Sequence, residues 1–146
     1  MKGLAYALGI SAGFGLALQV GMNAQLRKVL QSANTAALIS FLVGTTALLA
    51  LLIVTRQSLP ERSAFAAVPW WAWLGGVLGA FYVASSTVVA AELGTASLLG
   101  LALAGQLATA LVIDHFGWLG MPEHPITWVR AAGVVLLGSG VWLITR

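Results

Sequence analysis

The sequence contains five apolar segments, each long enough to cross a lipid bilayer as a single helix. They cover approximately residues 4–23, 35–55, 70–91, 94–113 and 126–144. A transmembrane helix needs about 20 mostly apolar residues, and in hydrocarbon every backbone N–H and C=O must be bonded within the helix or within a closed barrel. Barrel strands alternate apolar and polar residues over about 10 positions, and these segments do not. We therefore predict an all-α membrane protein, with residues 1–146 forming one five-helix transmembrane domain.

The composition excludes most other classes of protein. Apolar residues make up 60% of the chain and charged residues only 8%, whereas soluble domains carry roughly 25% charged residues. No basic run is interleaved with aromatic residues, so we expect no nucleic-acid site. The chain has no cysteine, which excludes disulfides and thiolate ligands. The apolar N-terminal segment continues without a small-residue cleavage site, and we expect it to be an uncleaved first span.

The positive charges lie almost evenly on the two sides that five spans define. Four of the seven fall on the side of the N-terminus and three on the other; they are Lys2, Arg56, Arg62 and Arg130, against Arg27, Lys28 and Arg146. A Lys/Arg excess in short loops orients a membrane protein, and an excess of one is weak. We predict dual topology, in which the chain inserts in both orientations. The alternative is one orientation set by this small bias.

An odd number of spans has a consequence for symmetry. Five helices cannot be divided into two equal halves, and the sequence shows no internal repeat. Many secondary transporters are built from two inverted repeats, with the substrate site near the membrane midplane. Two copies of a five-helix chain in opposite orientations would reproduce such a ten-helix arrangement. We therefore predict an antiparallel homodimer in the lipid bilayer.

Two longer loops interrupt the apolar pattern. Residues 56–69 contain Pro60 and Glu61, which suit the first turn of a short helix lying at the interface. Three tryptophans follow where the third span begins, and we expect them to anchor it at headgroup level; they are Trp70, Trp71 and Trp73.

Polar side chains inside the spans are candidates for a solute pathway, because they are costly in lipid. Gln19 and Asn23 lie four residues apart on one face of the first helix. The full candidate set is Gln19, Asn23, Tyr82, Ser86, Gln106 and Thr109. The alternative interpretation is structural: the amides bridge helices, and the hydroxyls bond to the backbone of their own helix.

Two acids near the spans, Glu92 and Asp114, are candidates for proton or ion coupling. The alternative is that Glu92 is a hydrated turn residue and that Asp114, with His115, anchors a loop by pairing with Arg130. The histidines and acids of that loop lack the spacing that organises a metal site. No nucleophile–base pair or phosphate-binding loop is present, so we expect no enzyme activity, metal or cofactor.

Small residues recur at four-residue spacing in several spans, as in Gly9 with Gly13 and Gly75 with Gly79. Such pairs let helices approach closely in lipid. We expect most of them to pack within one chain and the remainder to contact a second chain.

Several stretches resemble a known family of membrane proteins. They are LQVGMNAQLR at 18–27, FLVGT at 41–45, WWAWLGGVLGA at 70–80, GQL at 105–107 and DHFG at 114–117. Together they are similar to the YdcZ-like inner-membrane exporters of the drug/metabolite transporter superfamily, and the resemblance covers essentially the whole chain. It implies a half-size transporter of the bacterial cytoplasmic (inner) membrane. Small multidrug resistance proteins carry an essential carboxylate in their first helix, and this first helix has none.

These observations together predict a half-size secondary exporter of a small, unidentified solute, working as an inverted homodimer by alternating access. Two alternatives stay open. One is a scaffold or accessory subunit without transport activity. The other is a pathway for a lipid or amphiphile, because even the candidate polar face is largely apolar.

Overall fold

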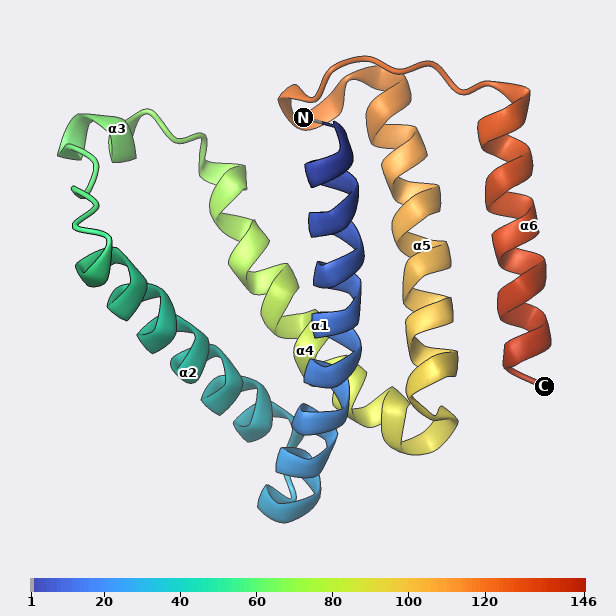
Figure 1. Cartoon of the computed structure of the whole chain (residues 1–146), viewed down its shortest axis with the longest axis horizontal. Helices are drawn as coiled ribbons and strands as arrows, with labels where there is room; N and C mark the ends of the chain where they lie inside the picture. Colours follow the sequence, from blue (N-terminus) through green and yellow to red (C-terminus); the bar gives the residue numbers. More distant parts are fainter. Residues whose placement is uncertain (1) are drawn as a thin grey trace. The chain divides into compact units, whose positions relative to one another are not determined.

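The computed structural model describes residues 2–146, and the regular structure among these residues is entirely helical (Figure 1). Its elements are α1 (Lys2–Leu30), α2 (Ala33–Val54), α3 (Arg62–Ala66), η1 (Trp70–Trp73), α4 (Leu74–Leu93), α5 (Thr95–Phe116), η2 (Trp118–Gly120) and α6 (Trp128–Ile144). The chain forms two compact units, the first ending at Val88 and the second beginning at Val89.

The all-α membrane class predicted from the sequence is confirmed. Four helices in the described residues are long and apolar enough to cross a membrane: α1, α2, α4 with its preceding turn, and α5. The fifth predicted span corresponds to α6, which has 17 residues. At 1.5 Å per residue, α6 is about 26 Å long, which is near the lower limit for a span.

In the first unit, α1 and α2 form a hairpin with a two-residue connection. Gln31 adopts a left-handed conformation, with φ of 53°, and its side-chain amide donates to the carbonyl of Lys28 at 2.6 Å. Ser32 then caps α2, because its hydroxyl accepts a hydrogen bond from the backbone N–H of Thr35 at 3.2 Å. These two caps satisfy backbone groups that every helix end leaves free, and they fix the sharp reversal.

Helix α1 is longer than the span predicted at 4–23. It continues past Asn23 through Gln25, Arg27 and Lys28 and stops at Leu30. Gln, Arg, Lys and Leu are all good helix formers, and Arg27 and Lys28 in the last turn complement the negative end of the helix dipole. The apolar window therefore marks where the helix crosses lipid, and the helix itself extends beyond it.

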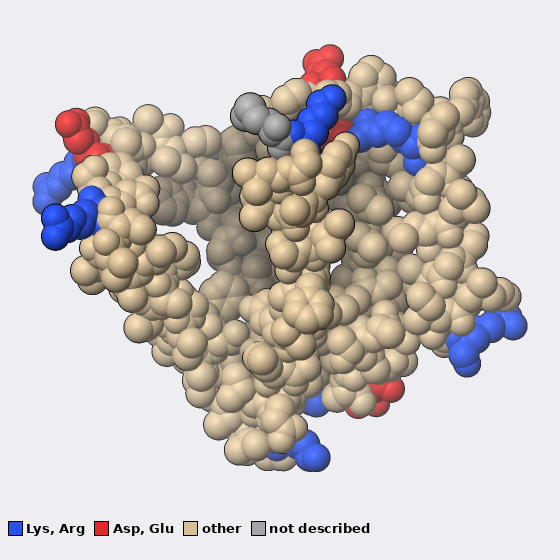
Figure 2. Space-filling model, viewed as in Figure 1, with Lys and Arg blue, Asp and Glu red and all other residues tan. Residues whose placement is uncertain are grey.

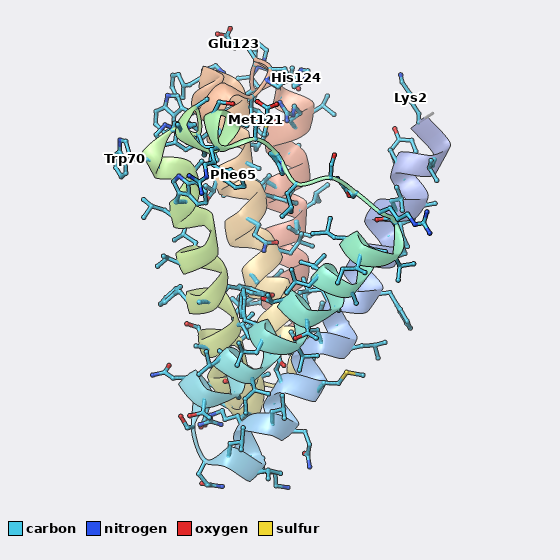
Figure 3. The ribbon with its side chains drawn as sticks, turned by 90° about the vertical axis from the view of Figure 1, so that its left-hand side faces the viewer. Lys2, Phe65, Trp70, Met121, Glu123 and His124 are labelled. Atoms are coloured by element: carbon cyan, nitrogen blue, oxygen red, sulfur yellow. The ribbon has the colours of Figure 1, made fainter. Side chains whose placement is uncertain are left out.

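Within the first unit, α2 and α4 converge at one end and diverge toward the other, where α3 lies (Figure 1). Helix α3 confirms the short helix predicted after Pro60, and it begins at Arg62 with Glu61 in the capping position. Phe65 of α3 and Trp70 of η1 lie at the same end of the unit as Lys2 (Figure 3). Trp70, Trp71 and Trp73 are 75%, 39% and 57% exposed. Their role as membrane anchors stays a prediction, and their exposure at the start of a span is compatible with it.

In the second unit, α5 and α6 lie side by side. They approach closely at Gly100, where a β-carbon would lie 3.2 Å from a methyl group of Val141. Val141 is itself only 7% exposed. Gly105, one and a half turns further along α5, has no atom within 4 Å of such a carbon. Gly100 is thus a packing position, and Gly105 is not.

Charged side chains lie at helix ends, and the lengths between them are uncharged. Lys2, Arg27 and Lys28 occupy the two ends of α1, and Figure 2 shows the charged side chains as a few small groups on an otherwise uncharged surface. A transmembrane helix requires this distribution, because a charge near the bilayer centre is costly.

We predict that Gly100→Leu destabilises the second unit and that Gly105→Leu does not. The larger side chain at position 100 meets Val141, and overpacking of this kind costs about 1–3 kcal/mol. Thermal unfolding of the purified protein in detergent, followed by circular dichroism, measures the difference. Both variants gain the same helix propensity over glycine, so equal melting temperatures would contradict the packing role of Gly100.

Candidate functional site

The candidate Ser86 and its neighbour Thr87 are both buried in α4, and their hydroxyls bond to their own helix. Ser86 is 2% exposed and Thr87 is fully buried. The Ser86 hydroxyl donates to the carbonyl of Val83 and the Thr87 hydroxyl to the carbonyl of Ala84, both at 2.8 Å. This is the bonding that the structural interpretation expects. Neither donor is left for a solute in this conformation, and a pathway role for Ser86 stays a prediction.

Tyr82, one turn before Ser86, differs from these hydroxyls. Its side-chain oxygen is buried and has no hydrogen-bond partner in the part of the chain that the structure describes. Leaving a buried hydroxyl unpaired costs about 1–3 kcal/mol, and groups of this kind call for a water, ligand or partner that completes them. Tyr82 is therefore a buried candidate in the first unit with unused hydrogen-bonding capacity.

The candidate amides fall into two environments. Asn23 is buried, at 4% exposure. Gln19, one turn earlier on α1, is exposed, and so are Gln106 and Thr109 of α5. In a bilayer, exposed amides within a span face other protein or water in preference to lipid. Gln19 and Gln106 therefore mark surfaces that the single units leave incomplete.

A groove of about 600 Å³ runs between α2 and α4 in the first unit. Both helices line it with residues at positions i, i+3, i+4 and i+7; they are Asn34, Ala37, Leu38 and Phe41 from α2, and Val77, Ala80, Phe81 and Ala84 from α4. The ring of Phe41 comes within 3.4 Å of a β-carbon built on Gly79. Asn34 alone supplies a side-chain amide. The lining is apolar and contains three alanines, so the groove can accept a bulky apolar occupant.

The candidate acid Asp114 is held at the end of α5 by an ion pair. Its carboxylate oxygen lies 2.5 Å from a terminal guanidinium nitrogen of Arg130, and the two side chains are 29% and 35% exposed. The other terminal nitrogen of Arg130 donates to the carbonyl of His124 at 2.7 Å. The pairing that the loop-anchor interpretation named is thus present in the structure.

The backbone of the same loop is fixed by two further bonds. The N–H of His124 donates to the carbonyl of Asp114 at 2.7 Å, and that of Ile126 donates to Nδ1 of His115 at 3.3 Å. Gly117 ends α5 with φ of 60°, and a β-carbon there would lie 2.7 Å from the side chain of Glu123. We call residues 114–130 the α5–α6 latch. Figure 3 shows Met121, Glu123 and His124 together within this segment.

The other candidate acid, Glu92, is exposed near the C-terminal end of α4. Gly94 follows with φ of 83° and leads directly into α5. Glu92 makes no ion pair with any residue in the range 2–146. Within that range no three His, Cys, Asp or Glu side chains gather closely enough to hold a metal ion.

Sequence reasoning missed the α2–α4 groove and the extent of the latch. The groove residues do follow a helical period, but every face of α2 is apolar, so its lining face has no contrast with the others. The latch could have been anticipated further, because Asp114 lies in the last turn of α5 and Arg130 in the first turn of α6, on either side of one loop.

Comparisons with known proteins bear on the whole chain. Residues 4–143 match the family described as "Putative inner membrane exporter, YdcZ". The chain is also 29% identical to "Inner membrane protein YdcZ" of Escherichia coli (strain K12), over 99% of this chain and 97% of that protein. No solved structure is significantly similar to it.

We predict that Arg130→Gln loosens the α5–α6 latch without unfolding the helices. The change removes the ion pair with Asp114 and the bond to the His124 carbonyl, which together contribute about 1–2 kcal/mol at a site one-third exposed. Amide hydrogen exchange should then accelerate roughly tenfold across residues 117–127, since 1.4 kcal/mol corresponds to a factor of ten.

Arg62→Gln is the matched control, because Arg62 makes no ion pair among the described residues. Equal exchange in the loop for both variants would mean that Arg130 does not hold the latch.

Proposed function

Because this chain belongs to the YdcZ family of inner membrane exporters and is a multi-pass inner membrane protein, we propose that it is a half-size secondary exporter of a small solute. Two copies in opposite orientations form the working unit and alternate the access of a shared pathway. The observation that carries this proposal is the exposure of Gln19 and Gln106 within spans.

Two polar side chains within spans, each exposed in its own unit, need either a protein partner or water. A solute pathway between two chains supplies both, because it is lined by protein and hydrated. Glutamine offers two donors and an acceptor, so it can exchange hydrogen bonds with water for bonds to a polar solute at little net cost. Tyr82 adds a hydroxyl without a partner in the described chain, and it is a third candidate for solute contact.

The α2–α4 groove supports the dimeric part of the proposal. Its two lining stripes have the spacing of a surface that packs against a third helix, and the alanines at positions 37, 80 and 84 allow close approach of another backbone. A helix of the second copy is the occupant we assign to it. Gly9 and Gly13 of α1 have no atom within 4 Å of an added β-carbon, and α1 thus presents a narrow face suited to such a groove.

The charge distribution supports opposite orientations of the two copies. With four positive residues on one side and three on the other, neither orientation is strongly favoured by the positive-inside rule. For coupling, Glu92 is a better candidate than Asp114, because the Asp114 carboxylate already pairs with Arg130 while Glu92 is exposed.

We predict that single cysteines report both orientations in cells. The chain has no native cysteine, so Ser58→Cys in the loop after α2 and Gln31→Cys in the loop after α1 are clean labels on opposite sides. A membrane-impermeant maleimide added to intact cells should label about half of the molecules of each variant. Labelling of only one variant would show a single orientation and would rule out an inverted dimer of identical chains.

The geometry of the pair is tested by coexpressing the two variants with different tags. In an inverted dimer, residue 58 of one copy and residue 31 of the other lie on the same membrane face. A bifunctional maleimide should therefore join 58 to 31 and should not join 58 to 58. The reverse result would identify a parallel dimer.

We predict that Gln19→Ala and Gln106→Ala reduce export while leaving folding unchanged. A flux screen in proteoliposomes over cations, amines, sugars and amphiphiles first identifies the solute. Each substitution should then lower its flux roughly tenfold, since a lost hydrogen bond contributes about 1–1.5 kcal/mol. Gln57→Ala, which removes the same amide from a loop, is the control. Full flux in both span variants, or a screen without any transported solute, would favour the scaffold alternative.

A further inference from the structure

A second groove lies between α5 and α6 and takes no part in the proposed export. Its volume is about 390 Å³. Each helix contributes a stripe at positions i, i+3, i+4 and i+7; these are Leu107, Ala110, Leu111 and Asp114 from α5, and Arg130, Gly133, Val134 and Leu137 from α6. The apolar residues fill one part of the groove, and the Asp114–Arg130 ion pair closes the end near the latch.

The lining residues extend along both helices. The seven residue steps from Leu107 to Asp114 correspond to about 10 Å at 1.5 Å per residue. Gly133 contributes no side chain, and a β-carbon built on it meets no atom within 4 Å. The space beside Gly133 is therefore open, and a larger side chain there would occupy it without displacing the fold.

The polar end keeps hydrogen-bonding capacity for a ligand. Arg130 has five N–H donors, and in the described chain two of its nitrogens each make one bond, to Asp114 and to the His124 carbonyl. Asp114 uses one carboxylate oxygen, Oδ2, in the ion pair, and its other oxygen is not engaged by that bond. Both side chains are about one-third exposed, so a ligand can reach them.

The position of this end matches the level of lipid headgroups. Asp114 lies in the last turn of α5 and Arg130 in the first turn of α6. Trp118 and Trp128, which are 56% and 92% exposed, lie in the latch between them. Exposed tryptophans of this kind concentrate at the interface between headgroups and acyl chains. The groove therefore begins at the headgroups and runs toward the membrane interior.

We propose that the α5–α6 groove binds one molecule of a zwitterionic phospholipid with a primary ammonium group, namely phosphatidylethanolamine. One acyl chain lies along the apolar stripes beside Gly133. The phosphate accepts hydrogen bonds from Arg130, and the ammonium donates to Asp114. Each charge of the headgroup then meets its opposite, and the four charges sum to zero.

Charge and size favour this occupant over two others. An anionic lipid would satisfy Arg130 but leave Asp114 next to a second negative group, which is unfavourable. A helix of a second copy would cover the partly exposed ion pair with apolar side chains, at the cost of desolvating both charges. The α5–α6 groove is also smaller than the α2–α4 groove, to which we assign a helix of the second copy, at about 390 against 600 Å³.

Native mass spectrometry of the full-length protein in detergent tests the proposal. The protein is titrated separately with dioleoyl phosphatidylethanolamine, phosphatidylglycerol and phosphatidylcholine. We expect the ethanolamine lipid to give the most one-to-one adduct, and we expect Gly133→Leu to reduce that adduct at least fivefold. Gly138→Leu is the matched control, because Gly138 is an open position on the same helix outside the groove. Arg130→Gln should also weaken the adduct.

Three results would overturn the assignment. Equal binding of the glycerol lipid would mean that Asp114 does not select the headgroup. Equal binding of the choline lipid, which has no N–H donor, would mean that the ammonium group does not donate to Asp114. Unchanged binding in Gly133→Leu would place the lipid elsewhere. Helical content by circular dichroism confirms that each variant is folded, and Gly133→Leu leaves the latch contacts intact even where Arg130→Gln does not. None of these outcomes depends on solute export.

Discussion

The acyl chains of lipid offer no hydrogen bonds, so every polar side chain within a span must find its hydrogen-bond partners in protein or water. The hydroxyls of Ser86 and Thr87 find their partners within their own helix, because each donates to one of its carbonyls. Gln19 and Gln106 are exposed on α1 and α5 and cannot find partners among acyl chains. The difference separates residues that stabilise a helix from residues that require something beyond the helix, and function is to be sought among the second group.

Small residues decide where the helices of each unit touch. Hydrophobic burial does not drive association in lipid, so close packing must. Gly100 permits the contact with Val141, and Gly79 permits the approach of Phe41. Glycines at positions 9, 13, 105 and 133 meet no neighbour within 4 Å. An unpacked glycine weakens a helix by roughly 1 kcal/mol relative to alanine, so these open positions cost stability within the unit that contains them.

The sequence predicts the helices well and the surfaces between them poorly. Span length follows from bilayer thickness, and loop residues such as Pro60 and Gly94 mark the interruptions, so the order of the helices is readable. The end of α1 at Leu30 was misplaced, because hydropathy records where lipid ends and not where helical hydrogen bonding ends. The α2–α4 groove was not predicted, because α2 is apolar on all sides and its lining face has no polar face for contrast. The pairing of Asp114 with Arg130 could be named in advance, since both lie at the ends of helices joined by one loop.

The position of the acids limits how export can be driven. The chain has four acidic residues, and none lies within α1 or α2. Asp114 holds the α5–α6 latch through Arg130, so releasing it for proton exchange would also release the loop. Glu92 is exposed near the turn into α5, at the end of a helix and away from its middle. A proton carried by Glu92 would therefore bind near the end of α4, where it can alter the α4–α5 turn, and not at a residue in the middle of a span. Coupling in such a protein would have to act on the conformation of a helix pair and not by competition for a shared carboxylate.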